Sequence, residues 1–436
     1  MQIGIIGSGH VGLVTGACFA DLGHDVHCID SDEKKIRLLK KGGCPIYEPE
    51  LHDLIKRSVL QKRLRFSHRI RDAVENCDIL FICVGTPTKE TGETDLSAVT
   101  QVAEQIAHHM KKYTLIVEKS TVPVETCLHI KKVIQKKLKR KIAFDVASNP
   151  EFLREGSAVQ DFFVPDRIVI GVDSKKAEEL LRIVYRPFRA PILVTDPKSS
   201  EIIKHASNSF LSTKISFINA IARLCDAVGA DVGKVAEGMG LDPRINRSFL
   251  NAGLGFGGFC FPKDLAAFIH IAEKNGVEFN LLKDVLTINH EQKMYFVRLV
   301  EKMLGSLKGK KLAVLGLSFK PNTDDMRFAP SLDIIPALQK RGAQISAYDP
   351  VAIAESRTYF KQVKFTSSVY EACRKVDGIL ILTEWREFQE MDLNRIRKIV
   401  KKPVIIDGRN MYDPQVMRKN GFKYQGIGKG FKSIKR

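Results

Sequence analysis

Residues 1–30, MQIGIIGSGHVGLVTGACFADLGHDVHCID, hold the pattern that decides the fold. An apolar run at Gln2–Ile6 predicts a buried strand, Val11–Leu22 has helical spacing, and Asp25–Ile29 is a second apolar run. Further strand candidates, with helical stretches between several of them, are Ile79–Val84, Thr114–Val117, Phe144–Ala147 and Arg167–Ile170. This alternation predicts a parallel sheet covered by helices on both faces.

The six residues Gly7–Gly12, Gly-Ser-Gly-His-Val-Gly, match the GxGxxG pattern of a dinucleotide-binding turn. They follow the first strand and open the first helix, which is the context that the pattern requires. Gly7 permits the tight turn, Gly9 lets the backbone approach a pyrophosphate, and Gly12 lets the helix pack on the strand. The helix N-terminus would supply N–H groups and a partial positive charge to the phosphates.

The acid that completes this pattern is Asp30, at the end of the second strand. Its carboxylate would bind the ribose hydroxyls and repel a 2′-phosphate, so the sequence predicts NAD as the cofactor in preference to NADP. Lys35 either lies near the adenosine end of the cofactor or is a solvent-facing helix lysine.

The pattern of predicted strands and helices changes twice after the first α/β segment. Glu201–Val228 has helical spacing over an unusual length, and helical pattern continues to about residue 303 around a glycine-rich loop at Asn251–Gly258. Strand candidates then return at Leu312–Leu317, Gln344–Tyr348, Gly378–Leu382 and Val404–Ile406. We therefore expect two Rossmann-like, doubly wound α/β domains, residues 1–200 and 304–425, joined by a helical domain at 201–303. A loose basic tail is expected at 426–436.

Composition restricts the class of protein. The 436 residues include 69 Lys and Arg against 50 Asp and Glu, a net charge of +19 that favours anionic partners. Nine scattered cysteines, without a CxxC pair or zinc-like spacing, indicate a reducing cytoplasm and no metal site. No stretch approaches the ~18 apolar residues that span a membrane, and the start does not read as a signal peptide.

A nucleophile candidate lies in the stretch Gly257–Asp264, Gly-Gly-Phe-Cys-Phe-Pro-Lys-Asp. A helix that begins at Pro262 would place Cys260 near its positive end, which lowers the pKa of a thiol and makes it nucleophilic. Asp264 lies within side-chain reach of that turn. We expect the other eight cysteines to be small buried apolar residues.

Two pairs of polar residues are spaced four apart, as on one face of a helix. Lys204 and Asn208 would form an oxyanion-stabilising pair, and Glu151 and Glu155 could take different pKa values for acid and base roles. A solvated helix face is the alternative interpretation of each pair.

Two threonines follow strands of the first segment. Thr86 lies in Gly85-Thr86-Pro87 and Thr121 in Ser120-Thr121-Val122-Pro123. Ligands of open α/β sheets bind at the carboxyl ends of strands, so both are placed for binding. Ordinary turn chemistry is the alternative.

In this order, these motifs resemble those of the UDP-glucose/GDP-mannose dehydrogenase family, and the likeness covers nearly the whole chain. The motifs that carry it are the GxGxxG turn, Val84–Pro87, Ser120–Pro123, Asn149–Gly156, the Lys204/Asn208 helix, Phe249–Gly253, the Cys260 loop and Phe319–Arg327.

The resemblance implies a four-electron oxidation at C6 of a nucleotide sugar, from alcohol through aldehyde to acid, with two NAD+. Cys260 would attack the aldehyde to give a thiohemiacetal, and the second oxidation would give a thioester that water hydrolyses. Lys204 and Asn208 would stabilise the oxyanion, and Asp264 would assist the water or the thiol. The remaining implied roles, in water and proton transfer, fall on Thr121, Glu151 and Glu155. Which glutamate is the base stays open.

The implied contacts extend over all three segments. Those with the cofactor are Gly7, Gly9, Val11, Gly12, Asp30, Lys35, Thr86, Thr121, Glu155, Lys263 and Arg327. Those with the substrate are Glu151, Phe152, Leu153, Arg154, Glu155, Lys204, Asn208, Phe249, Leu250, Asn251, Ala252, Gly253, Gly257 and Lys320. The last domain would bind the nucleotide sugar, and the long central helix would form a homodimer.

Some residues depart from the family pattern. Phe259 stands where a small residue precedes the cysteine, Ala220 and Phe328 each replace a frequent glutamate, and Arg247-Ser248 precede the Phe249 loop. The likeness favours UDP-glucose as substrate, with GDP-mannose and UDP-N-acetylmannosamine as alternatives. A basic nucleic-acid-binding protein is a more distant alternative, supported by the net charge and by Lys131–Lys141. No nucleic-acid-binding motif accompanies that stretch, and only one tryptophan is present.

Overall fold

The computed structural model of this protein describes residues 1–89 and 91–430. Two compact units are present, Met1–Ser207 with Ala266–Val277, and Asn208–Leu265 with Glu278–Arg436. The helical segment expected at 201–303 is therefore shared between the two units. The division of the sequence at residues 200 and 303 stays a prediction.

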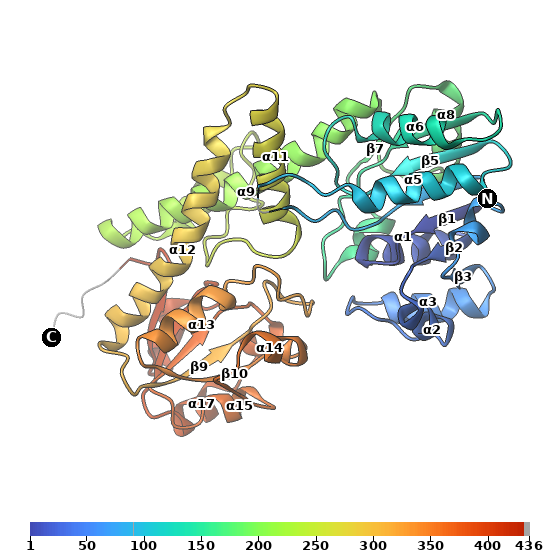
Figure 1. The fold of residues 1–436 in the computed structure, drawn as a ribbon. Coiled ribbons are helices and arrows are strands. Elements are labelled where there is room, and N and C mark those ends of the chain that lie inside the picture. Colours follow the sequence, from blue (N-terminus) through green and yellow to red (C-terminus); the bar gives the residue numbers. More distant parts are fainter. Residues whose placement is uncertain (90, 431–436) are drawn as a thin grey trace. The chain divides into compact units, whose positions relative to one another are not determined.

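The first unit contains an eight-stranded sheet in the order β3-β2-β1-β4-β5-β6-β7-β8 (Figure 1). The strands are β1 Gln2–Ile6, β2 Asp25–Ile29, β3 Leu64–Ser67, β4 Ile79–Ile82, β5 Thr114–Glu118, β6 Phe144–Ser148, β7 Ile168–Gly171 and β8 Ile192–Thr195. The first six have the strand order of a dinucleotide-binding fold. β7 runs antiparallel to β6 through the single pair Ser148 and Gly171, so β7 and β8 form a parallel pair in the opposite direction.

Helices connect these strands and cover the sheet. They are α1 His10–Asp21, α2 Glu33–Lys40, α3 Leu51–Leu60, α4 Ile70–Val74, α5 Ser97–His109, α6 Thr126–Lys137, α7 Ala158–Phe163 and α8 Lys175–Val184. α1 is the central one: nine of its twelve residues are buried. Its Gly16 allows the closest approach to the sheet, because a Cβ there would lie 2.4 Å from Cys28 Sγ.

α9, Pro197–Val228, is the long helix drawn in green in Figure 1. It starts four residues before the expected Glu201 because proline is tolerated in the first turn, where its missing N–H is not needed. It ends at Gly229, whose φ of +81° is the left-handed conformation that terminates helices. α9 passes from the first unit into the second at Ser207–Asn208.

The second unit contains a six-stranded parallel sheet in the order β11-β10-β9-β12-β13-β14, the same order as β1–β6. Its strands are β9 Lys311–Leu315, β10 Gln344–Tyr348, β11 Val363–Phe365, β12 Gly378–Ile381, β13 Val404–Asp407 and β14 Lys423–Gly426. The remaining helices are α10 Val232–Gly240, α11 Cys260–Lys274, α12 Asn280–Leu304, α13 Ser331–Lys340, α14 Ile353–Tyr359, α15 Val369–Ala372, α16 Arg386–Gln389, α17 Leu393–Ile399 and α18 Pro414–Lys419. Two doubly wound sheets and a long helix confirm the expected fold class.

The expected loose tail at 426–436 is wrong for its first five residues. Ile427 is fully buried, and the amides of Gly428 and Gly430 donate to the Asp226 carboxylate at 2.8 and 3.2 Å. Lys429 pairs with Asp231 at 2.8 Å. Paired backbone and a buried side chain hold this segment in place, although its composition is typical of a flexible one. Residues 431–436 lie outside the described part of the chain.

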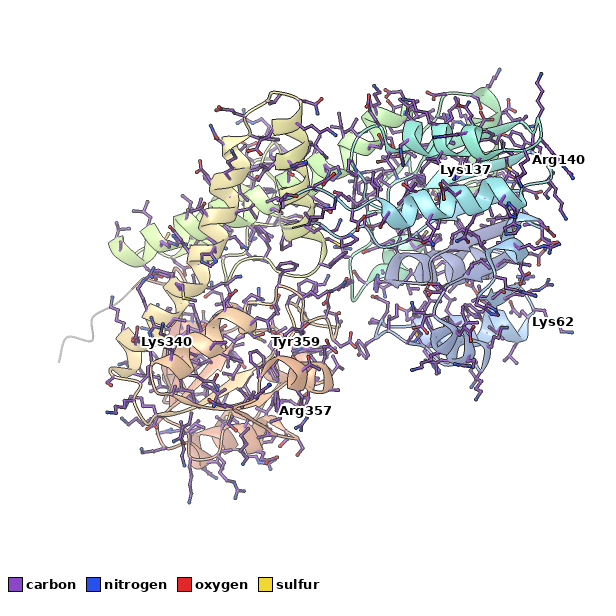
Figure 2. The ribbon with its side chains drawn as sticks, in the orientation of Figure 1. Lys62, Lys137, Arg140, Lys340, Arg357 and Tyr359 are labelled. Atoms are coloured by element: carbon purple, nitrogen blue, oxygen red, sulfur yellow. The ribbon has the colours of Figure 1, made fainter. Side chains whose placement is uncertain are left out.

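The excess positive charge is carried at the surface of both units. Figure 2 shows Lys62, Lys137 and Arg140 extending outward from the first unit, and Lys340 and Arg357 from the second. None of the helices within residues 1–89 and 91–430 has the length and hydropathy needed to cross a bilayer.

Candidate functional site

The turn between β1 and α1 has the geometry that its three glycines predict. Gly7 has φ +99°, and a Cβ there would lie 2.6 Å from the carbonyl oxygen of Cys83. At Gly12 a Cβ would lie 1.9 Å from the Gly7 carbonyl oxygen, so no residue with a side chain fits at this position. A Cβ at Gly9 would meet nothing within 4 Å, and no side chain caps the N-terminus of α1. The backbone is thus open to a pyrophosphate where the pattern requires it, and the turn fits a dinucleotide.

Asp30 lies beside this turn, and hydrogen bonds hold its carboxylate in place. Its Oδ2 accepts hydrogen bonds from the Ser8 amide at 2.9 Å and from Lys35 Nζ at 2.8 Å. The structure therefore brings Lys35 to Asp30, and the place of both residues at the adenosine end of a cofactor stays a prediction. The Asp30 side chain is only 11% exposed, with its second oxygen bonded to the Asp32 amide.

Two loops at the carboxyl ends of β4 and β5 meet through the predicted threonines. Thr86 Oγ1 donates to the carbonyl oxygen of Thr121 at 2.8 Å. Thr86 is buried, so this bond also satisfies its hydroxyl. Both threonines lie at the carboxyl ends of the strands, where open α/β folds bind ligands.

Glu151 and Lys204 form a nearly buried ion pair in the first unit. Lys204 Nζ donates to Glu151 Oε1 at 3.1 Å, and the two side chains are 6% and 5% exposed. The Leu153 amide donates to the other carboxylate oxygen at 2.6 Å. Removing one partner of a buried ion pair leaves the other group uncompensated in the interior, which is strongly destabilising.

The helical interpretation of Glu151 and Glu155 is wrong. Residues 151–154 have no regular structure, Glu155 lies in a turn, and α7 begins only at Ala158. Gly156 has φ +82°, a conformation that a regular helix cannot include. The two glutamates therefore belong to a loop after β6, and their spacing of four does not place them on a common helix face.

Phe152 and Arg154, in the same loop, have separate partners in the first unit. The Phe152 ring lies 5.3 Å from Lys204 Nζ, and its closest cation is Arg167, at 3.7 Å. Arg154 is exposed and pairs with Asp161.

A carboxylate that has no sequence motif, that of Glu48, joins this loop to the dinucleotide turn. Glu48 Oε2 lies 2.7 Å from His10 Nε2 and accepts from the Gly156 amide at 2.8 Å, while its Oε1 accepts from Ala158. Burial lowers the pKa of His10, but the Glu48 hydrogen bond and nearby carboxylates, including Glu155, outweigh it and raise the pKa above its ordinary value. No local signal marks Glu48, because its partners lie 38 to 110 residues away.

Lys119 is a second group that the sequence did not reveal. It is buried and donates to Asn149 Oδ1 at 3.0 Å, and Tyr185 donates to the same oxygen at 2.5 Å. Burial lowers the pKa of Lys119 to about 8. Its place directly before Ser120-Thr121 is the only signal that could have drawn attention to it.

In the second unit, Cys260 is the first residue of α11. The helix starts two residues before the expected Pro262, and the thiol therefore lies at its N-terminal end as expected. Cys260 is partly exposed, unlike seven of the other eight cysteines, which are buried. Burial raises the pKa of three of these, Cys77, Cys83 and Cys373, to about 12, which keeps them protonated and unreactive.

Asp264 follows Cys260 by one turn of α11 and is completely buried. Its Oδ2 accepts from Asn208 Nδ2 at 2.6 Å, and its Oδ1 accepts from Lys263 Nζ at 2.6 Å. The structure thus brings together three of the predicted residues, Asn208, Asp264 and Lys263, at the start of the helix that carries the thiol.

The Cys260 loop is held by the segment around Arg327. The Gly258 amide donates to the Arg327 carbonyl at 2.9 Å, and a Cβ at Gly257 would lie 2.4 Å from the Phe328 oxygen. Phe328 has φ +53°, an uncommon conformation for an aromatic residue. Lys320 Nζ lies 5.4 Å from the ring of Phe319, in the same segment.

The loop Phe249–Gly253 is fixed at its end by buried amides. The Gly253 amide donates to Asn219 Oδ1 at 2.8 Å, and Gln292 Nε2 donates to the Gly253 oxygen at 2.9 Å. Leu250 and Ala252 are buried, whereas Asn251 is exposed. Phe249 has φ +64°, so the loop starts in a conformation that its neighbours must enforce.

Family models cover most of the chain. Residues 1–189 match the NAD binding domain of the UDP-glucose/GDP-mannose dehydrogenase family, residues 198–291 its central domain, and residues 313–414 its UDP binding domain.

Individual relatives agree with these models. The chain is 50% identical over 429 residues to the UDP-glucose 6-dehydrogenase TuaD of Bacillus subtilis, covering 98% of this chain and 93% of the relative. It is 44% identical to a UDP-glucose 6-dehydrogenase of Rhizobium meliloti, covering 98% and 100%. Among solved structures, a UDP-glucose dehydrogenase of Pyrobaculum islandicum matches with a TM-score of 0.91 at 38% identity, covering 98% and 97%.

Proposed function

This chain belongs to the UDP-glucose/GDP-mannose dehydrogenase family, and from that premise we propose that it oxidises UDP-glucose to UDP-glucuronate. It is an NAD-dependent dehydrogenase, since its first domain matches an NAD-binding model and its glycine turn fits a dinucleotide. The observation that carries the proposal is Cys260 at the start of α11, one turn before the buried Asp264. A simple alcohol oxidation would not use this thiol, whereas oxidation to the acid through a covalent thioester does.

The reaction would proceed in two oxidations and a hydrolysis. C6 first loses a hydride and its hydroxyl a proton, giving the aldehyde, and the Cys260 thiolate then adds to that carbon as a thiohemiacetal. Loss of a second hydride gives a thioester, and water displaces the thiolate to release the carboxylate. NAD+, when bound, would accept one hydride in each oxidation, so two NAD+ are used in succession. The balance is one alcohol, two NAD+ and one water converted to one carboxylate, two NADH and three protons.

The polar groups would have different roles in these steps. Lys204 and Asn208 would stabilise the oxyanion that forms at C6 when the thiolate or water adds. Asp264, held by Lys263 and Asn208, would orient the water or accept the thiol proton. The remaining proposed participants in water and proton transfer are Thr121, Glu151 and Glu155.

The remaining predicted contacts are proposed in the same terms. Lys263 and Arg327 are proposed contacts of the anionic cofactor, since both cations can give charge-assisted hydrogen bonds. Phe249–Gly253, Gly257 and Lys320 would bind the nucleotide sugar.

Substrate choice is tested by counting products. With UDP-glucose we expect two NADH for each sugar consumed, measured by NADH absorbance together with assay of the uronate. GDP-mannose and UDP-N-acetylmannosamine are the matched controls and should give no more than about one hundredth of that rate. Turnover of a control sugar in place of UDP-glucose would keep the chemistry and change the substrate, whereas no NADH with any of the three would refute the proposal.

We also propose a homodimer formed through α9. Phe210, Phe217 and Leu224 are spaced seven apart, which places them on one face of the helix, and they are 65%, 48% and 57% exposed. Such a stripe of exposed large apolar side chains is typical of a helix that packs against a partner. Phe217→Glu should convert a dimer to a monomer in sedimentation, with Leu241→Glu, another exposed apolar position, as control. A Phe217→Glu protein that remains dimeric would exclude this face.

The proposed location is the cytoplasm, where the reducing environment suits the nine free cysteines. The product would serve as a glucuronate donor for polysaccharide synthesis.

A further inference from the structure

The aromatic ring of Phe259, the residue before the nucleophile, lies next to two cations. The guanidinium carbon of Arg327 is 4.3 Å from the ring centroid and Lys263 Nζ is 5.4 Å from it, both within cation–π range. We propose that Phe259 is a positioning residue, whose ring holds Lys263 and Arg327 in place for the anionic cofactor. The part of this inference that concerns cofactor binding rests on the proposed function.

The backbone fixes the ring relative to Arg327. The Gly258 amide, directly before Phe259, donates to the Arg327 carbonyl at 2.9 Å. Gly258 has φ +77°, and a Cβ there would lie 2.7 Å from the Phe319 ring. The loop is therefore closely packed at this point, and the backbone bond keeps the loop that carries the Phe259 ring beside the segment that carries Arg327.

The ring also connects two ion pairs. Arg327 pairs with Asp325 at 2.7 Å, and Lys263 pairs with Asp264 at 2.6 Å. The face of an aromatic ring is negative, so it attracts both cations without accepting a hydrogen bond from either in the manner of a carboxylate. Phe259 thus couples the Arg327 pair to the Asp264 carboxylate, which Asn208 also contacts.

This arrangement reduces the ordering that binding requires. Lys and Arg side chains have many rotamers, and restricting them before an anion arrives increases affinity because less conformational entropy is lost on binding. The ring itself does not need to contact the cofactor, and its effect is exerted through the two cations. Loss of the ring should therefore weaken NAD+ binding without changing the nucleophile.

The test is direct calorimetric titration of NAD+ into the full chain and three variants. Phe259→Tyr keeps the ring, Phe259→Leu keeps apolar bulk but removes the ring, and Phe259→Ser removes both. We expect the dissociation constant to rise about tenfold in the Leu and Ser variants and less than about twofold in Tyr. In turnover, the same two variants should raise KM for NAD+ with kcat nearly unchanged.

The Leu variant separates the two explanations. If Phe259→Leu binds NAD+ as tightly as the wild-type chain, bulk alone is sufficient and the inference is overturned. Equal affinity in all four proteins would also overturn it and would leave the proposed function intact. Failure of the wild-type chain to bind NAD+ would instead show that NAD+ is not the cofactor, and it would refute both proposals. Equal thermal unfolding of the Leu and Tyr variants ensures that affinity is compared between folded proteins.

Discussion

Cys260→Ser is expected to reduce uronate formation by about a thousandfold or more. A serine hydroxyl is not ionised near neutral pH, so the variant lacks the thiolate that must add to the aldehyde carbon. The first oxidation does not use the thiol, and we therefore expect NADH production to stop near one per site in a single turnover. The measurement is rapid-mixing absorbance of NADH with UDP-glucose, followed by assay of the sugar product.

Cys44→Ser is the matched control for this variant. Cys44 is the other partly exposed cysteine, its thiol donates to the Ile46 carbonyl at 3.2 Å, and it lies in the loop before α3. Its replacement should leave both the rate and the two NADH per sugar unchanged. A Cys260→Ser enzyme that still makes uronate near the wild-type rate would exclude a covalent thioester and require direct hydration of the aldehyde.

The parts of the fold that the sequence predicted are the central strands. β1 and β2 have the expected bounds because most of their residues are buried: four of the five in β1 and three of the five in β2. The four strands without a prediction, β3, β8, β11 and β14, are the edges of the two sheets. Their exposed positions interrupt the apolar pattern, as in β3, where Arg65 is exposed between buried Leu64 and Phe66. Edge strands are defined by the neighbour with which they pair, and local sequence carries little information about it.

The candidate site shows the same limit. Motifs whose chemistry is local, such as the glycine turn and the thiol at a helix start, were visible because a few adjacent residues define them. The roles of Glu48 and Lys119 depend on bonds to distant segments, which spacing does not encode. Spacing alone was also misleading at Glu151 and Glu155, where the positive φ of Gly156 favours a loop.

Asp264→Asn is expected to destabilise the protein by about 3 kcal/mol and to lower kcat by about a hundredfold. Asp264 is completely buried and Lys263 is 7% exposed, so the substitution removes the carboxylate but leaves the ammonium group in the interior. The amide keeps the shape and can still accept one hydrogen bond from Asn208. Chemical denaturation followed by circular dichroism measures the stability, and NADH formation measures the rate.

A second substitution separates stability from catalysis at this position. Adding Lys263→Met to Asp264→Asn removes the remaining buried charge, so much of the lost stability should return while the rate stays low. Asp242→Asn serves as the surface control, because Asp242 pairs with an Arg244 side chain that is 87% exposed, and it should change neither quantity. Recovery of both stability and rate in the double variant would show that Asp264 only neutralises Lys263. Because Lys263 is itself a proposed cofactor contact, kcat is measured at saturating NAD+ and compared with that of Lys263→Met alone. Recovered stability with a kcat well below that of Lys263→Met would identify the carboxylate as a participant in the reaction.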